Sequence, residues 1–271
     1  MSKLPYAEVI GDPIAQSKSP LIHGFWLAAL GLQGRYDRAH VTSGGLAGYI
    51  ADRRADPAWR GCNVTMPHKQ AVMELVDDPG NIRGTIGAMN TVVHQPDGSL
   101  IGTNTDAAGF FAPLAEMELQ GAPIVVVGAG GAARAVLFAL ARAGVGPVTM
   151  LARSPLKAMG LLAAFGLKGH AAALDAPLPP AALLVNASSL GMTGQPALDL
   201  DLAPLPDGAI VYDLVYSPLR TRLLQAAEAR GLDQVDGLDM LIGQAALAFE
   251  LFFGRSPPEG CDDELRALLT A

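Results

Sequence analysis

Short hydrophobic, often β-branched runs alternate with longer segments of helical character along this chain. Strands that alternate with helices predict the α/β class, with parallel strands covered by helices. In the first part, Ser19 and Pro20 predict the start of a helix that continues to about residue 30. Pro67 predicts a second helix start. Strands are expected at residues 6–11 and 62–65, and a hairpin at residues 88–94 and 99–102.

The second part begins with a helix expected from about residue 106 to residue 119. From there the alternation becomes regular, which predicts a parallel sheet of its own. At 271 residues the chain is long enough for two domains, each with a hydrophobic core. The expected strands are 123–127, 147–151, 183–186 and 209–215, and the expected helices are 131–143, 219–229 and 240–253.

Composition and charge exclude several classes of protein. Half of the residues are hydrophobic and 17% are charged, which is typical of a globular chain. The net charge of −7, without a lysine- or arginine-rich run, argues against nucleic acid or anionic membranes as partners. Hydrophobic runs such as residues 135–141 are far shorter than the ~18 residues of a membrane span. Cys62 and Cys261 are isolated and predict neither disulfide nor metal site, so we expect a cytoplasmic protein.

A glycine-rich loop follows the strand expected at residues 123–127 and opens the next helix. The spacing matches G-x-G-x-x-G/A, which allows a tight turn and lets a pyrophosphate bind the helix N–H groups. Such glycines can also serve only to pack a strand against a helix, but the flanking βαβ pattern favours a dinucleotide. The residues expected at the pyrophosphate are Gly128, Ala129, Gly130, Gly131, Ala132 and Ala133.

The loop after the next strand indicates which dinucleotide is bound. NAD sites usually carry an acidic residue there for the ribose 2′-hydroxyl. Residues 151–157 contain no acid and instead carry Arg153, Ser154 and Lys157. A guanidinium with a neighbouring hydroxyl suits a 2′-phosphate, so we predict NADP as the cofactor. The alternative is that Arg153 is a solvated loop cation.

Four polar clusters follow hydrophobic stretches in the first part of the chain, where strands should open into a cleft. Their hydroxyls, amides, two lysines and one aspartate suit a ligand with several hydroxyl groups. They hold no group of His, Cys and carboxylates with metal-ligand spacing, so no metal is expected. The clusters are residues 17–20, 63–69, 87–91 and 102–106.

These clusters, the glycine loop and several later segments together resemble the shikimate dehydrogenase family in order along nearly the whole chain. The resemblance implies NADP-dependent interconversion of 3-dehydroshikimate and shikimate by hydride transfer, in the biosynthesis of aromatic amino acids. It also implies a substrate-binding catalytic domain of residues 1–105, joined by 238–271 as the last helix returns, and a Rossmann-type NADP domain of residues 106–237. The later matching segments are 186–188, 211–218 and 237–246.

The resemblance also implies roles for individual residues. Lys69 and Asp106 would form the catalytic acid–base pair, and Ser17 and Ser19 would bind the substrate carboxylate. The residues implied at the ring hydroxyls are Thr65, Asn90 and Gln244, with Asn63 and Tyr216 nearby, and those at the nicotinamide end are Met192, Leu214 and Gly237.

Three positions depart from the family pattern. Gln16 stands where histidine is common, Gly24 where asparagine is usual, and Ala152 where asparagine commonly precedes the arginine. Because of the first two departures, the sequence does not decide which substituents of the substrate ring are recognised. A quinate/shikimate dehydrogenase of the same family is therefore the alternative function. The third slightly weakens the NADP prediction. A non-catalytic NADP sensor is a further alternative, but the retained acid–base pair argues against it. The sequence does not decide whether the protein is a monomer or a homodimer.

Local structural roles compete with some of these assignments. Ser19 and Asp106 could each cap a helix. With Pro67 in a first helical turn, Lys69 would lie where the helix dipole disfavours a cation. Its spacing from Val72 would direct its side chain toward the protein or a cleft. A buried amide such as Gln244 requires a polar partner, which favours a role in ligand binding.

Overall fold

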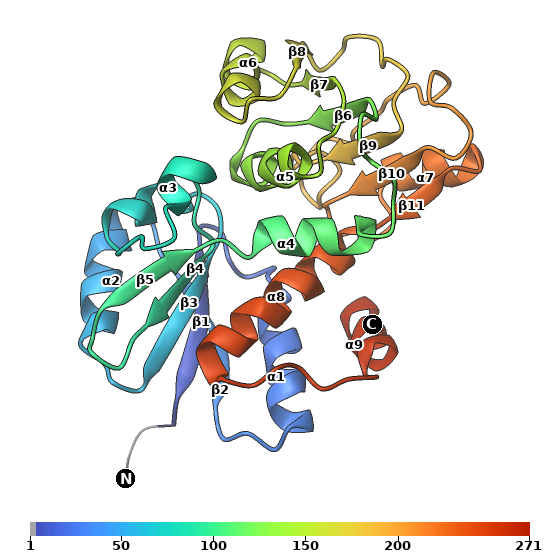
Figure 1. Cartoon of the computed structure of the whole chain (residues 1–271). Coiled ribbons are helices and arrows are strands. Elements are labelled where there is room, and N and C mark those ends of the chain that lie inside the picture. The colour runs from blue at the N-terminus through green and yellow to red at the C-terminus, as the bar shows by residue number, and fades with distance from the viewer. Residues whose placement is uncertain (1–3) are drawn as a thin grey trace. The chain divides into compact units, whose positions relative to one another are not determined.

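The computed structural model describes residues 4–271, which divide into two compact units (Figure 1). The first unit contains the chain up to Thr105 together with Ile242–Ala271, and the second contains Asp106–Leu241. The end of the chain therefore returns to the first unit, as the sequence predicts.

A five-stranded mixed sheet forms the centre of the first unit, in the order β2-β1-β3-β4-β5. The first three strands along the chain pair in parallel, and β4 and β5 form an antiparallel hairpin. The predicted strand at residues 6–11 and the predicted hairpin are confirmed. The strands are β1 (Tyr6–Gly11), β2 (Arg35–His40), β3 (Trp59–Val64), β4 (Thr91–His94) and β5 (Leu100–Thr103).

Both faces of this sheet are covered, so every residue of β1 is buried. Successive side chains of a strand point to opposite faces. Tyr6 and Ile10 pack into a core with α2, whereas Ala7 and Val9 pack against α8. The helices that contribute to this unit are α1 (Ser19–Ala29), α2 (Leu46–Arg54), α3 (Ile82–Thr85), the second part of α8 (Gly237–Phe253), and α9 (Asp262–Thr270).

Two predicted helices are wrong in their extent. Residues 66–70 form turns and are followed by a 3₁₀ helix, Ala71–Glu74, because the Lys69 carbonyl accepts a hydrogen bond from the Met89 amide instead of continuing a helix. The helix expected at 106–119 is only α4 (Asp106–Phe111) with a 3₁₀ turn at Ala112–Leu114. Pro113 lacks the N–H group that would continue α4. In this unit the prediction also omits β2, α2, α3 and α9, and it takes α8 as the last helix of the chain, which is wrong.

The second unit is a six-stranded parallel sheet in the order β11-β10-β9-β6-β7-β8. Reversed, this is the strand order 3-2-1-4-5-6 of a doubly wound dinucleotide fold, which confirms the predicted class. The strands are β6 (Ile124–Val127), β7 (Val148–Leu151), β8 (Gly169–Ala172), β9 (Leu183–Asn186), β10 (Ile210–Asp213) and β11 (Asp233–Val235), and the remaining helices are α5 (Gly131–Arg142), α6 (Pro155–Ala164) and α7 (Arg222–Ala229).

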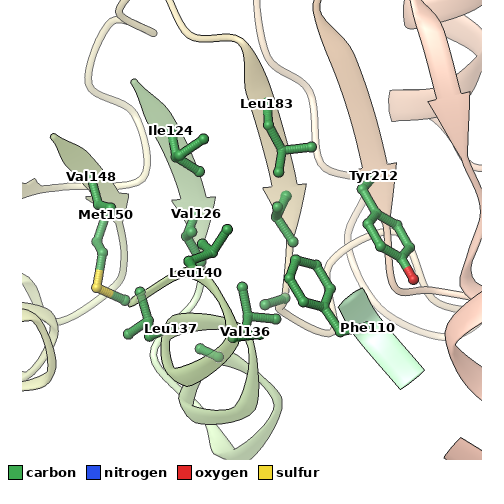
Figure 2. Close-up of a cluster of buried hydrophobic side chains, with 14 of the residues drawn as sticks. Phe110, Ile124, Val126, Val136, Leu137, Leu140, Val148, Met150, Leu183 and Tyr212 are labelled. Atoms are coloured by element: carbon green, nitrogen blue, oxygen red, sulfur yellow. The ribbon is translucent and has the colours of Figure 1, made fainter. Parts of the chain in front are cut away.

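Two hydrophobic cores hold this sheet, one on each face. On one face Ile124 and Val126 point toward Val136 and Leu140 of α5 (Figure 2). On the other face Val125 and Val127 pack with residues that include those of α7. All four residues of β6 are buried, which is typical of a central parallel strand. This rigid centre carries the glycine loop at its carboxyl end.

Candidate active site

The glycine loop joins β6 to α5 in a conformation that requires glycine at its first position. Gly128 has φ +105°, and a Cβ there would lie 3.0 Å from the Ala187 carbonyl oxygen. Gly130 is the N-cap of α5 and is extended, and a Cβ there would meet no atom of the described chain within 4 Å. The N-cap of α5 makes no side-chain capping hydrogen bond, because glycine has no side chain, so the first N–H groups of α5 are left for a ligand. The backbone therefore forms a cradle that fits a pyrophosphate.

This loop lies where the strand order of the sheet reverses. The amide of Gly128 donates to Leu151 at the end of β7, and the amide of Ala187 after β9 donates to Val127 at the end of β6, at 2.8 and 2.9 Å. Crossovers on the two sides of β6 leave toward opposite faces, and ligands of such sheets bind at this point. All six residues predicted from Gly128 to Ala133 belong to this loop or to the first turn of α5.

The residues expected at a 2′-phosphate, two cations and a serine, follow β7, the strand next to β6. Arg153, Ser154 and Lys157 are exposed, and Ser154 is the N-cap of α6. Its hydroxyl makes no capping hydrogen bond to this helix. The structure thus brings a guanidinium and a hydroxyl to the carboxyl edge of the sheet, beside the strand that bears the glycine loop.

A buried carboxylate ties together the loops after β9 and β10. Asp213 accepts hydrogen bonds from Asn186 Nδ2 at 2.8 Å, from the Val215 amide at 3.0 Å and from Thr221 Oγ1 at 2.6 Å. Burial raises the pKa of Asp213, while these three hydrogen bonds oppose that shift. Asp213 is not among the site residues predicted from the sequence, although an aspartate at the end of a hydrophobic run is a visible signal.

The residues predicted at the nicotinamide end lie on these loops. Gly237 packs so closely that a Cβ would be 2.6 Å from the carbonyl oxygens of Leu214 and Val215. The residue after Met192, Thr193, donates its amide to the Ser217 carbonyl at 2.8 Å. Met192, Leu214 and Tyr216 are each partly exposed. The second unit therefore places these predicted residues on connected loops at one edge of its sheet.

In the first unit, polar residues gather after the carboxyl ends of β1 and β3. The Thr65 amide donates to Ile10 at 2.9 Å, and a Cβ on Gly11 would lie 2.5 Å from Thr65 Cγ2. Lys69 follows in the turns after β3 and is partly exposed. Its position differs from the expected first turn of an α-helix, so the argument from a helix dipole does not apply to Lys69. Val72 and Met73 are buried, as the spacing predicts.

The two serines form a pair at the start of α1. Ser17 Oγ donates to Ser19 Oγ at 3.3 Å and accepts from the Ser19 amide at 3.3 Å. Lys18, and not Ser19, is the N-cap, so the capping role considered for Ser19 is wrong. Arg38 of β2 donates from Nε to the Ser17 carbonyl at 2.9 Å. No motif in the sequence signalled that Arg38 supports this loop.

Three of the predicted amides lie in one hydrogen-bonded group. Asn63 Nδ2 lies 3.4 Å from the Asn90 carbonyl, and Asn90 Nδ2 lies 3.4 Å from Gln244 Oε1. All three side chains are buried. Gln244 therefore has the polar partner that its position in a hydrophobic helix required.

Asp106 is the buried first residue of α4 and belongs to the second unit, whereas Lys69 belongs to the first. Asp106 follows Thr105, whose amide donates to Asn90 Oδ1 at 2.7 Å. The Lys69 carbonyl accepts from Met89, the residue before Asn90, at 2.8 Å. Lys69 and Thr105, both in the first unit, are thus held at the loop that contains Asn90.

Comparison with known proteins identifies the family. Residues 9–92 match the family described as "Shikimate dehydrogenase substrate binding domain", and residues 237–262 match "Shikimate 5'-dehydrogenase C-terminal domain". A protein of Sphingopyxis alaskensis named shikimate dehydrogenase (NADP(+)) is 82% identical over 98% of this chain and 97% of its own length. The chain belongs to the shikimate dehydrogenase family.

Solved structures agree with this membership of the shikimate dehydrogenase family. The shikimate 5-dehydrogenase of Thermus thermophilus, solved with NADP(H) and shikimate, has a TM-score of 0.85 and 40% identity, covering 98% of this chain and 100% of that chain. The 5-ketofructose reductase of Gluconobacter sp. strain CHM43, in a ligand-free form, has a TM-score of 0.87 and 31% identity, covering 98% of each chain. The resemblance inferred from the sequence motifs is therefore confirmed. Within residues 4–271, no helix combines the length and hydrophobicity that crossing a membrane requires.

Proposed function

We propose that this member of the shikimate dehydrogenase family catalyses the NADP-dependent reduction of 3-dehydroshikimate to shikimate, and the reverse reaction, in aromatic amino-acid biosynthesis. The observation that carries the proposal is the 82% identity, over nearly the whole chain, to the shikimate dehydrogenase (NADP(+)) of S. alaskensis. The order of the polar clusters along the chain supports it independently.

The second unit would hold the cofactor. The cradle from Gly128 to Ala133 would bind the pyrophosphate through backbone N–H groups, and Arg153 with Ser154 and Lys157 would bind the 2′-phosphate. NADPH, when bound, supplies the hydride. The residues proposed to line the nicotinamide end are Met192, Leu214 and Gly237.

The first unit would provide most of the substrate contacts. The Ser17 and Ser19 hydroxyls would donate to the carboxylate, near the N-terminus of α1, where N–H groups favour an anion. The amides of Asn90 and Gln244 offer both donors and acceptors, which suits ring hydroxyl groups. The remaining proposed substrate residues are Asn63, Thr65 and, from the second unit, Tyr216.

Lys69 and Asp106 would handle the proton. In the direction of reduction, the carbonyl carbon gains a hydride and the carbonyl oxygen gains a proton, which the Lys69 ammonium would donate. The Asp106 carboxylate would orient that ammonium and the product hydroxyl. Support comes from the backbone, which holds Lys69 and the residue before Asp106 at the loop containing Asn90.

We also propose a cytoplasmic location and action as a monomer or homodimer, with a small molecule as the partner and no nucleic acid. Cys62 and Cys261 are both free, as is usual in a reducing compartment. The negative net charge disfavours association with nucleic acid.

The test of the proposed function is a comparison of substrates and cofactors in one assay. Reduction of NADP⁺ and of NAD⁺ is followed with shikimate and with quinate, and oxidation of NADPH with 5-ketofructose. We expect the highest kcat/KM for shikimate with NADP⁺. A preference for quinate would establish the alternative within the family, and binding of NADP⁺ without turnover of any substrate would establish a sensor.

A further inference from the structure

A series of buried side chains connects Tyr36 to the amides of the proposed substrate site. Tyr36 OH donates to Asn63 Oδ1 at 2.6 Å, and Asn63 Nδ2 donates to Thr91 Oγ1 at 3.1 Å. Thr91 Oγ1 in turn donates to Asn90 Oδ1 at 3.0 Å. Asn90 Nδ2 then lies 2.9 Å from Thr105 Oγ1 and 3.4 Å from Gln244 Oε1.

Backbone groups fix the direction of this series at both amides. The Thr105 N–H can only donate, and it does so to Asn90 Oδ1 at 2.7 Å. The Asn90 carbonyl can only accept, and it does so from Asn63 Nδ2. Asn63 must therefore turn its oxygen toward Tyr36, and Asn90 must turn its NH₂ toward Gln244. Neither amide can be turned over without breaking these hydrogen bonds.

The phenol of Tyr36 is suited to be a donor at the start of the series. Burial raises its pKa well above the usual value, so the group keeps its proton. Its ring is held by stacking on His23, with ring centroids 3.9 Å apart and an angle of 5° between the planes. Burial lowers the pKa of His23 to about 3, so the stacked ring is uncharged near neutral pH.

We propose that Tyr36 and Thr91 are positioning residues that, together with the Thr105 N–H and the Asn90 carbonyl, hold the Asn63 and Asn90 amides in the orientation that meets the ring hydroxyls of the substrate. This inference rests on the proposed function. Neither residue is assigned to direct contact with the substrate. Loss of either hydroxyl would leave the amide next to it held by its other hydrogen bonds alone, so hydroxyl recognition would weaken while the carboxylate and cofactor contacts stay intact. With Gln244 Oε1 turned toward Asn90, its NH₂ lies on the opposite side of the amide.

The chain offers a matched control for Tyr36 in Tyr49 of α2. Tyr49 OH donates to Glu8 Oε2 at 2.7 Å, and Tyr49 packs against the core on the opposite face of the same sheet. Tyr36→Phe and Tyr49→Phe each remove one hydroxyl from a hydrogen bond to a buried acceptor in the first unit. Only the first breaks the series of amides. Thr91→Val removes the second hydroxyl at nearly constant volume, whereas Thr91→Ser retains it.

The experiment measures kcat and KM for shikimate and for NADP⁺, together with thermal unfolding, for the full-length chain and these four variants. We expect Tyr36→Phe and Thr91→Val to raise the KM for shikimate about tenfold, as for a lost hydrogen bond to a bound ligand, with the KM for NADP⁺ changed less than about twofold. Thr91→Ser should recover most of the wild-type KM. Tyr49→Phe should lower the melting temperature without changing either KM.

Two results would overturn the inference: a wild-type KM for shikimate in both Tyr36→Phe and Thr91→Val, or an equal rise in Tyr49→Phe. Shikimate-induced stabilisation of the cofactor-free protein provides a second readout that requires no turnover. If the wild-type protein neither oxidises shikimate nor is stabilised by it, the proposed function itself fails, and this inference falls with it. If the wild-type protein is active and the variants have the same KM for shikimate, only the positioning role is rejected and the proposed function stands.

Discussion

Asn186 Nδ2 lies 2.8 Å from Asp213 Oδ1, and both side chains are fully buried at the carboxyl ends of the neighbouring strands β9 and β10. Asn186 also donates to the Leu190 carbonyl at 2.9 Å and accepts from Ser188 Oγ at 2.7 Å. One pair of side chains thus holds the starts of the loops that contain Met192 and Leu214. The proposed nicotinamide end depends on this pair for its shape.

Removal of this carboxylate should destabilise the second unit. Asp213→Ala would leave three donors, on Asn186, Val215 and Thr221, without their acceptor. We expect the free energy of unfolding to fall by about 3 kcal/mol or more, measured by denaturant unfolding. Asp201→Ala is the control, since Asp201 is exposed and accepts an amide hydrogen bond from Ala203, so its loss should change stability little. Equal effects of the two substitutions would contradict this role for Asp213.

The glycine loop permits a test that separates folding from cofactor binding. Gly130→Ala adds a Cβ that meets no described protein atom within 4 Å, so stability should stay unchanged while the methyl group obstructs the pyrophosphate. We expect the KM for NADP⁺ to rise roughly tenfold or more and the melting temperature of the cofactor-free protein to stay constant. Gly128→Ala should instead lower stability by about 1–3 kcal/mol, because φ is +105° there. An unchanged KM in Gly130→Ala would place the pyrophosphate elsewhere.

Arg153 should decide between the two cofactors. Arg153→Ala should raise the KM for NADP⁺ by roughly 10- to 100-fold, because the guanidinium would no longer pair with the 2′-phosphate. The KM for NAD⁺ should change little, since that cofactor lacks the phosphate. Arg142→Ala serves as a control at the other end of α5. Parallel rises for both cofactors would contradict the assignment of Arg153.

His23 should make the folded state sensitive to acid. Its ring is buried, neither of its nitrogens has a hydrogen-bond partner among residues 4–271, and burial lowers its pKa to about 3. In the unfolded chain the His23 side chain has a pKa of ~6.5, so it takes up a proton there before it does so in the folded state. The free energy of unfolding therefore decreases as pH falls from about 6.5 toward 3. This one group contributes up to about 1.4 kcal/mol of lost stability per pH unit within that window.

The measurement is denaturant unfolding of the wild type and of His23→Phe between pH 4 and pH 7. Phenylalanine keeps the stacking on Tyr36 and cannot be protonated, so the difference in stability should shift in favour of the variant as pH falls. A difference that stays constant with pH would show that His23 does not set this dependence.

Lys69 should govern the chemical step. Lys69→Ala should lower kcat by about 10²–10⁴-fold, the range for a lost acid–base group, with a much smaller change in the KM for shikimate. Lys168→Ala removes an exposed lysine from the second unit and should leave kcat unchanged. Near-normal turnover of Lys69→Ala across pH 6–10 would remove Lys69 from the mechanism.

Local signals in the sequence were sufficient to predict the structure wherever one short segment determines its own conformation. The turn at Gly128 follows from glycine spacing between a strand and a helix, because the backbone there has a positive φ. The central strands β6 and β9 are fully buried hydrophobic runs, which is how a strand buried on both faces appears in a sequence. The edge strands β8 and β11 are largely exposed and were not predicted. The fold class, the cofactor loop and the family could therefore be predicted from the sequence.

Only the tertiary structure determined which distant side chains meet. Tyr36 and Asn63 are 27 positions apart, and Asn90 and Gln244 are 154 apart. Whether they can bond depends on the register of strands and on how α8 packs across the sheet, which no short segment encodes. The same holds for Arg38 beneath Ser17, and for Lys69, which the sequence predicted to lie in an α-helix. The Met89 amide of the neighbouring loop donates a hydrogen bond to the Lys69 carbonyl, and this bond holds the Lys69 backbone in a turn. The tertiary hydrogen bond therefore outweighs the local helix signal.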